Sequence, residues 1–286
     1  MPLVESALIT DLAERNKVYW REILYRAHFG ACTGLLRIRE WLHGSERAMA
    51  DGNVLMLAAG IRGLVEAAAD TFDCFSDVAP TLADSHVIVR RAISGELAEQ
   101  MALAPELESS LIHFAYARKL HAGEGPALHN AKTAKDCVAV LAESAPEISA
   151  VYASLCEYTH PAAPSIFRFA GTITHPDTLS FDPNFGAERI QELVALSRKI
   201  GQVSLVLAVA PLVMTLKVLN RFGVQEVTTL WADIISLSFS GMWLEIDKRL
   251  RDSRPPRIAT DEEHGRLLSQ LEAQYRPFGK KRGVSQ

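Results

Sequence analysis

Residues 52–77 read GNVLMLAAGIRGLVEAAADTFDCFSD, and they carry the clearest helical pattern in the chain. Alanine and leucine dominate this stretch, and its apolar residues recur every three or four positions, which is the period of an α-helix. The turn Asp51-Gly52-Asn53 precedes it and supplies an N-terminal cap. Because most of the chain follows the same pattern, we expect an all-α protein for the most part, built as a multi-helix bundle.

The same reasoning gives the domain organisation. The expected helices span residues 4–28, 31–48, 52–77, 84–101, 106–121, 131–142, 146–159, 186–220, 224–250 and 261–275. A small β-hairpin insertion is expected near 165–182, because the apolar period there drops toward two. We expect a single helical domain over 1–250, a Pro- and Arg-rich linker over 251–260, and a C-terminal helix with a basic tail over 261–286.

Composition excludes several classes of protein. The 286 residues are 48% hydrophobic and 22% charged, with a net charge of −4, which excludes wholesale disorder and a generally basic nucleic-acid coat. The four cysteines form no CxxC pair, and the N-terminus lacks the pattern of a signal peptide. We therefore expect a cytoplasmic protein with reduced cysteines. The uncharged run 200–216 predicts a buried core helix rather than a membrane span, because it is short and contains Pro211.

The helix at 52–77 carries a stripe of charged residues. They follow each other at steps of four, four, three and four, so they share one helix face: Arg62, Glu66, Asp70, Asp73 and Asp77. Two interpretations stay open. The stripe is either a solvated face, where such pairs are routine, or the wall of a polar cleft among the surrounding alanines.

A second group of polar residues lies at 152–161, YASLCEYTHP. Glu157 and His160 are three residues apart, so they are neighbours at the end of the helix, and Tyr152 lies about two turns earlier on it. Pro161 stops the helix there. His160 is either a C-terminal cap, which the helix dipole favours, or a member of a site with Tyr152 and Glu157.

Both groups resemble motifs of one known group of proteins. The segment AGIRGLVEAAADTFDCF (59–75) resembles the Arg-x3-Glu helix of uncharacterised bacterial helical proteins, and YASLCEYTHPAAPSIF (152–167) is similar to their Y-x2-L-(S/C)-E-Y-x-H-P signature. Those proteins look like distant relatives of the HEPN superfamily (higher eukaryotes and prokaryotes nucleotide-binding). The resemblance covers about residues 25–170, and it implies one polar cleft formed by Arg62, Glu66, Tyr152, Glu157 and His160.

The resemblance also implies a function. Active HEPN members are dimeric, metal-independent ribonucleases, so the expected protein is a ribonuclease, or an RNA- or nucleotide-binding relative, of a bacterial defence or stress system. His160 would be the acid/base, Glu157 its orienting partner and Arg62 the phosphate clamp. The expected partners are RNA or a nucleotide, a partner protein and a second copy of the chain. The Arg-x4–6-His pattern of active members does not precede His160.

Two alternatives stay open. The first is a non-catalytic interaction or regulatory module in which the same residues form a buried polar network. The second is a metal-dependent or small-molecule enzyme that uses the acidic stripe. Glu157-x-x-His160 is the only motif of the di-iron type, so we expect no metal and no cofactor. A basic patch from Arg90, Arg91 and two lysines, Lys132 and Lys135, is a candidate surface, although spacing alone does not show that they converge.

Overall fold

The computed structural model describes residues 9–121, 124–160, 185–238 and 240–252. All regular elements in these ranges are helical, and no strand forms there. They are α2 (Leu12–Ala50), α3 (Val54–Phe75), α4 (Val78–Asp84), α5 (His86–Ile93), α6 (Pro105–Tyr116), η1 (Ala127–His129), α7 (Ala134–Ser144), α8 (Glu147–Thr159), α10 (Phe185–Leu219), η2 (Asn220–Phe222), η3 (Gln225–Val227), α11 (Leu230–Ile234) and α12 (Gly241–Asp252).

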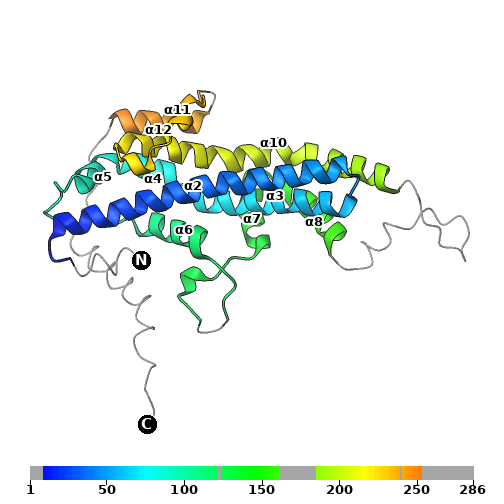
Figure 1. The fold of residues 1–286 in the computed structure, drawn as a ribbon, viewed down its shortest axis with the longest axis horizontal. Helices are drawn as coiled ribbons and strands as arrows, with labels where there is room; N and C mark the ends of the chain where they lie inside the picture. Colours follow the sequence, from blue (N-terminus) through cyan, green and yellow to red (C-terminus); the bar gives the residue numbers. More distant parts are fainter. Residues whose placement is uncertain (1–8, 122–123, 161–184, 239, 253–286) are drawn as a thin grey trace, which may run out of the picture. The chain divides into compact units, whose positions relative to one another are not determined.

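The prediction of a mostly α-helical bundle is confirmed (Figure 1). Several of the predicted boundaries differ. The helix expected at 84–101 is α5, which ends at Ile93, and α4 before it was not expected. The helix expected at 106–121 is α6, which ends at Tyr116. The helices expected at 4–28 and 31–48 are one continuous helix, α2, and the helix expected at 224–250 is divided into η3, α11 and α12. The β-hairpin expected near 165–182 and the helix expected at 261–275 lie outside the described residues.

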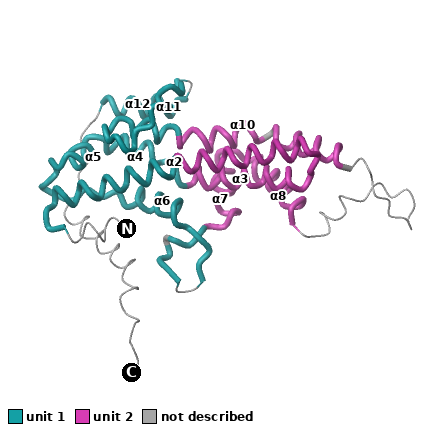
Figure 2. The backbone as a smooth tube through the Cα atoms, in the orientation of Figure 1, with its two compact units in different colours: residues 1–31, 74–131, 213–286 teal, residues 32–73, 132–212 magenta. Residues whose placement is uncertain are grey.

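The chain forms two compact units (Figure 2). Unit 1 comprises residues 1–31, 74–131 and 213–286, and unit 2 comprises residues 32–73 and 132–212. Each unit is therefore assembled from segments that are distant in the sequence, and α2, α3 and α10 contribute residues to both.

In unit 2, helices α2 and α3 pack closely because two glycines of α3 face α2. A Cβ atom at Gly63 would lie 2.7 Å from the ring of Trp41, and a Cβ at Gly60 would lie 2.4 Å from Ser45 Oγ. Both distances are shorter than real Cβ contacts, so a side chain at either glycine would require Trp41 or Ser45 to shift. The alanine-rich part of α3 is buried as well, with Ala68 fully shielded from solvent.

In unit 1, the buried amide of Asn16 on α2 holds the segment that joins α5 to α6. Its Nδ2 donates to Leu97 O at 3.0 Å and to Gln100 O at 2.7 Å, and its Oδ1 accepts from Ala102 N at 2.9 Å. Backbone groups that are buried without a partner are costly, so this side chain replaces the secondary structure that the segment lacks. The neighbouring Trp20 is 1% exposed and forms part of the core.

Helix α10, continued by η2, contains a long apolar stretch. Among the described residues, Ile200–Phe222 is the one segment long and apolar enough to cross a membrane by length and composition, with a mean hydropathy of 1.9. In the structure 61% of this stretch is buried against protein. The core helix of a globular domain has the same properties, so the stretch by itself is weak evidence of a membrane span.

Candidate functional site

Polar side chains of α3 and α8 form a continuous hydrogen-bond network in unit 2. Arg62 Nε donates to Glu66 Oε1 over 2.8 Å, and Arg62 Nη1 donates to Thr159 Oγ1 over 2.9 Å. The Tyr152 hydroxyl donates to the same Glu66 oxygen, also over 2.8 Å. Three of the five predicted site residues are therefore brought together, and Thr159 joins them although its hydroxyl was not predicted to take part.

Helix geometry explains why these four residues meet. Arg62 and Glu66 are one turn apart on α3, and Tyr152 and Thr159 are two turns apart on α8, so each pair shares one face of its helix. The Arg62 guanidinium also lies 5.9 Å from the centroid of the Tyr152 ring, within the range of a cation–π interaction. The network therefore fastens α8 to α3 at two points.

The network is half-buried, and this changes its proton affinities. The Arg62 and Glu66 side chains are 26% and 31% exposed. Burial, with the bond to Glu66, raises the pKa of Tyr152 well above its ordinary value, so its hydroxyl stays protonated and remains a donor. Burial acts to lower the pKa of Arg62, but the bond to the Glu66 carboxylate and the contact with Tyr152 outweigh it and raise that pKa.

The other two predicted site residues, Glu157 and His160, lie on the exposed side of α8. Tyr158 between them is buried, and its hydroxyl donates to Glu192 Oε2 on α10 over 2.8 Å. His160 ends the helix, with its backbone N–H donating to Cys156 O over 2.9 Å. No hydrogen bond or ion pair joins the side chain of Glu157 or His160 to the three predicted residues of the network, as far as the described residues show.

The rest of the charged stripe is ion-paired along α3. Asp70 accepts from Arg37 Nη2 over 2.6 Å, and Asp73, which is only 11% exposed, accepts from Lys132. Asp77 lies beyond the end of α3 and is exposed. The part of the stripe that belongs to unit 2 is therefore a half-buried, paired surface and not a fully solvated face.

All four cysteines lie within the described residues, and none forms a disulfide. One of them, Cys137 on α7, lies near the acidic stripe. Burial and then the negative charges of Asp70 and Asp73 raise the pKa of Cys137 to about 11. Because the thiolate is the nucleophilic form, a thiol with this pKa is unreactive at neutral pH.

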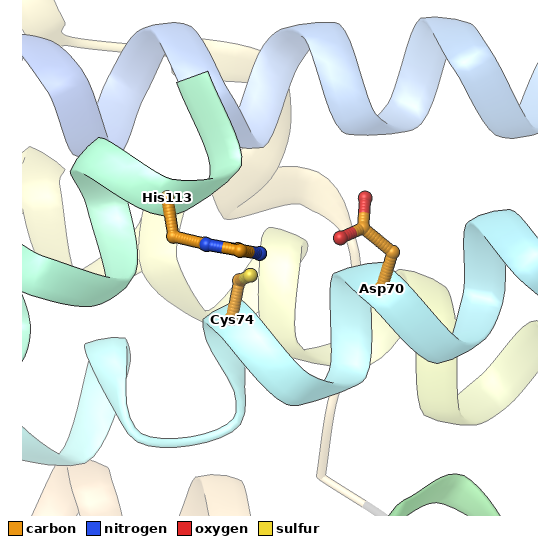
Figure 3. A group of neighbouring side chains, drawn as sticks. All are labelled: Asp70, Cys74 and His113. Atoms are coloured by element: carbon orange, nitrogen blue, oxygen red, sulfur yellow. The ribbon is translucent and has the colours of Figure 1, made fainter. Parts of the chain in front are cut away.

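Figure 3 shows Cys74 on α3 and His113 on α6, two residues of unit 1 whose thiol and imidazole are turned toward each other. Their ligand atoms lie within 4.8 Å of one another. Asp70, also labelled, lies one turn before Cys74 on α3 and belongs to unit 2. Zinc takes three or four protein ligands, so this pair of unit 1 residues does not make a complete metal centre.

Unit 1 contains a cavity of about 660 Å³ that was not anticipated from the sequence. It is lined by α5, by one residue of α2, and by the turn that joins η2 to η3. Gly223 makes this turn, and its φ of +71° is the left-handed conformation that glycine adopts without strain. The cations in the wall are Arg21, Arg90 and Arg91.

Two of the three arginines of the cavity form ion pairs with glutamates. Arg91 Nη2 donates to Glu99 Oε1 over 2.9 Å, and Arg21 lies 3.4 Å from Glu226 Oε1. Arg90 is exposed, and its guanidinium has no ion-pair or hydrogen-bond partner within the part of the chain that the structure describes. Arg90 is therefore an arginine of the cavity wall that forms no ion pair in the described part of the chain.

Aromatic rings form part of the cavity wall. The imidazole of His86 lies 5.2 Å from the ring of Phe222, centroid to centroid, and His86 Nε2 contacts Arg221 O at 3.3 Å. Burial lowers the pKa of His86, and the charges of Arg90 and Arg221 lower it further, although the contact with the Arg221 carbonyl acts in the opposite direction. The ring is therefore neutral at physiological pH, and the cavity combines cations with aromatic and apolar surface.

Two sequence signals for this cavity were present. The Arg90-Arg91 doublet is part of the candidate basic patch, and Gly223 lies between the helices expected at 186–220 and 224–250. Lys132 and Lys135, the other candidate members of that patch, belong to unit 2 and do not line the cavity.

No protein-family model matches this chain, and neither a curated protein nor a solved structure matches it. The HEPN resemblance, and the ribonuclease activity and homodimer that it implies, therefore stay predictions.

Proposed function

We propose that the protein binds a phosphorylated ligand of nucleotide size in the cavity of unit 1. The observation that carries this proposal is Arg90, the cation of the cavity wall without a partner among the described residues. A guanidinium presents a planar fork of donors that matches phosphate oxygens. The cavity volume of about 660 Å³ also falls within the range typical of small-molecule sites.

The composition of the wall favours a single phosphate group attached to a flat organic part. Three arginines and two glutamates, Glu96 and Glu226, line the cavity. Arg21 pairs with Glu226 and Arg91 pairs with Glu99, so one arginine of the wall is left for an anionic group. The Phe222 ring and the neighbouring apolar side chains offer a surface against which a base can stack. A nucleoside monophosphate, or the 5′-phosphorylated end of an RNA strand, has this chemistry.

In this proposal the network of Arg62, Glu66, Tyr152 and Thr159 is structural. Its groups are engaged with each other, and the high pKa of Tyr152 keeps that hydroxyl from serving as a base near neutral pH. Metal-independent ribonuclease activity is a second candidate, and one observation favours it. His160 directly follows Thr159, whose hydroxyl accepts from the Arg62 guanidinium of α3, so a candidate acid/base is next in the chain to a residue that binds a cation.

The test is the melting temperature of the protein with and without AMP, GMP and a short 5′-phosphorylated RNA, with adenosine as the ligand that lacks phosphate. Ligands that bind only the folded state raise the melting temperature. We expect AMP or GMP to raise it, adenosine to have less effect, and Arg90→Ala to remove the difference. The matched control is Arg118→Ala, an exposed arginine of unit 1 outside the cavity. An equal response to AMP in wild type and Arg90→Ala overturns the proposal.

A further inference from the structure

Unit 2 contains a separate apolar cavity of about 350 Å³ between α2, α3 and α10. Most of its surface is apolar, with Leu57, Ile61, Leu64 and Val65 contributed by α3. The apolar side chains Leu42 and Met49 of α2, which are 39% and 43% exposed, also line it. Close packing normally fills such space, so an apolar cavity of this size that is open to solvent is suited to an apolar ligand.

The lining of this cavity contains one arginine and one glutamate that are not paired with each other. Arg198 of α10 lines the cavity, is exposed, and has no ion-pair partner in the described ranges. Glu46 of α2 also lines it, and its Oε2 lies 4.0 Å from His43 Nδ1 on its own helix. A chain with an anionic head group therefore finds both apolar surface and a guanidinium donor there.

One buried hydroxyl of the wall differs from its neighbours. Ser45 Oγ donates to Trp41 O and Ser197 Oγ donates to Val194 O, as helical serines commonly do. Ser204, which is 1% exposed, has no hydrogen-bond partner for its Oγ among the described residues. Buried polar groups usually have partners, so a buried hydroxyl without one in the wall of this cavity is a second sign that the wall is not shaped for packing alone.

We propose that this cavity binds a carboxylate with an aliphatic chain, such as a medium-chain fatty acid. The chain lies among the aliphatic side chains of α3, and the carboxylate pairs with the Arg198 guanidinium. One arginine balances the single charge of a carboxylate, and the planar fork fits its two oxygens. This ligand is different from the phosphate ligand of unit 1, and the two proposals do not depend on each other.

Gly201 of α10 offers a direct way to block the cavity. It lines the cavity, and a Cβ atom built on it meets no atom within 4 Å, so a larger side chain has room to enter the open space. Gly44 of α2 is the matched control, because a Cβ there also meets no atom within 4 Å and the residue does not line the cavity. The variants Gly201→Phe and Gly44→Phe therefore add the same ring to a helix of unit 2.

The experiment is a calorimetric titration of the full chain with octanoate and with octanol. We expect octanoate to bind wild type and Gly44→Phe alike and to lose its binding to Gly201→Phe. Arg198→Gln should weaken the binding of octanoate by about tenfold, since it removes a charge-assisted bond. The affinity for octanol should be unchanged. The control Arg39→Gln removes an exposed arginine outside the cavity.

Three results would overturn the proposal. They are no binding of octanoate to the wild type, equal octanoate affinities of the wild type and Gly201→Phe, or equal losses of affinity for octanoate and for octanol in Arg198→Gln. Far-UV circular dichroism melts of each variant separate these results from failure to fold.

Discussion

The hydroxyl of Tyr152 donates to Glu66 Oε1 over 2.8 Å, and this oxygen also accepts from Arg62 Nε over the same distance. One carboxylate oxygen therefore connects a donor on α8 with a donor on its own helix, α3. Both donors point at an acceptor that is only half-exposed, so the pairing restricts the position of α8 against α3.

Tyr152→Phe tests the structural role of this connection. The substitution keeps the ring and removes the hydroxyl, so Glu66 loses one donor and the free energy of unfolding should fall by about 1 kcal/mol. Urea denaturation measures the change. Tyr116→Phe is the control, because the Tyr116 ring is 50% exposed and its hydroxyl has no hydrogen-bond partner among the described residues. A loss for Tyr116→Phe as large as that for Tyr152→Phe would contradict this role.

Asn16→Ala should be more destabilising than any surface change. It leaves the backbone groups of Leu97, Gln100 and Ala102 without their partner in a buried part of unit 1. Each such group costs on the order of 1–3 kcal/mol, so we expect a total of about 3 kcal/mol or more by chemical denaturation. Asn130→Ala, at an exposed asparagine of the same unit, should change stability by less than about 1 kcal/mol.

Glu108 makes the stability of unit 1 depend on pH. Burial raises the pKa of this carboxyl, although the Tyr19 hydroxyl and the Arg26 charge act to lower it. For a pKa raised by folding, the stabilising contribution is complete below the unfolded pKa and is lost as the pH rises through the folded pKa. Glu108→Gln has no carboxyl to ionise and so does not lose this stability. The stability of the variant relative to the wild type should therefore be greater at pH 8 than at pH 5.

Denaturation of wild type and Glu108→Gln at both pH values measures this difference. Glu106→Gln is the control, because Glu106 is an exposed glutamate of the same helix, α6. A difference between variant and wild type that stays constant from pH 5 to pH 8 would show that Glu108 does not titrate as burial predicts.

The ribonuclease prediction has a direct assay. Purified protein is incubated with labelled RNA of mixed sequence in EDTA, with His160→Ala beside it. If His160 is the acid/base, the wild type cleaves and the variant does not, while both melt at the same temperature because His160 is exposed. Cleavage by both proteins would assign the activity to another site or a contaminant, and cleavage by neither would favour the binding function.

The sequence predicts elements best where their ends carry chemical signals. The helices expected at 146–159 and 186–220 match α8 and α10 within a residue at each end, because proline and the 3.6-residue apolar period mark them. Gly30 lies in the gap between the helices expected at 4–28 and 31–48, where the structure has one continuous helix. A Cβ at this position would lie 2.6 Å from the Phe75 ring, so the glycine permits close packing and does not end a helix.

Hydrogen bonds of Asn220 and Ser240 explain why the helix expected at 224–250 is divided into η3, α11 and α12. The side chain of Asn220 donates to Thr229 O and accepts from Thr229 N, which holds the backbone out of a helix before α11. Ser240 Oγ then accepts from Trp243 N at the start of α12. Such side-chain bonds to the backbone compete with helical hydrogen bonds. The spacing of apolar residues over 224–250 gives no indication of them.

The predicted site was recovered in part for a similar reason. Helical spacing relates Arg62 to Glu66 and Tyr152 to Thr159, so each half of the network is readable in the sequence. The spacing of Glu157 and His160 also makes them neighbours, but it does not say which face of α8 is buried. The buried Tyr158 decides this, through its bond to Glu192 on α10, a helix that the resemblance does not cover.

Calorimetric titration with AMP is the most direct measurement of ligand binding in the unit 1 cavity. We expect saturable binding with one site per chain, an affinity that falls as salt concentration rises, and a loss of about tenfold or more in Arg90→Ala but not in Arg118→Ala. Absence of binding to the wild type at millimolar AMP, or equal affinities for the wild type and Arg90→Ala, would contradict the assignment of this cavity as a phosphate-ligand site.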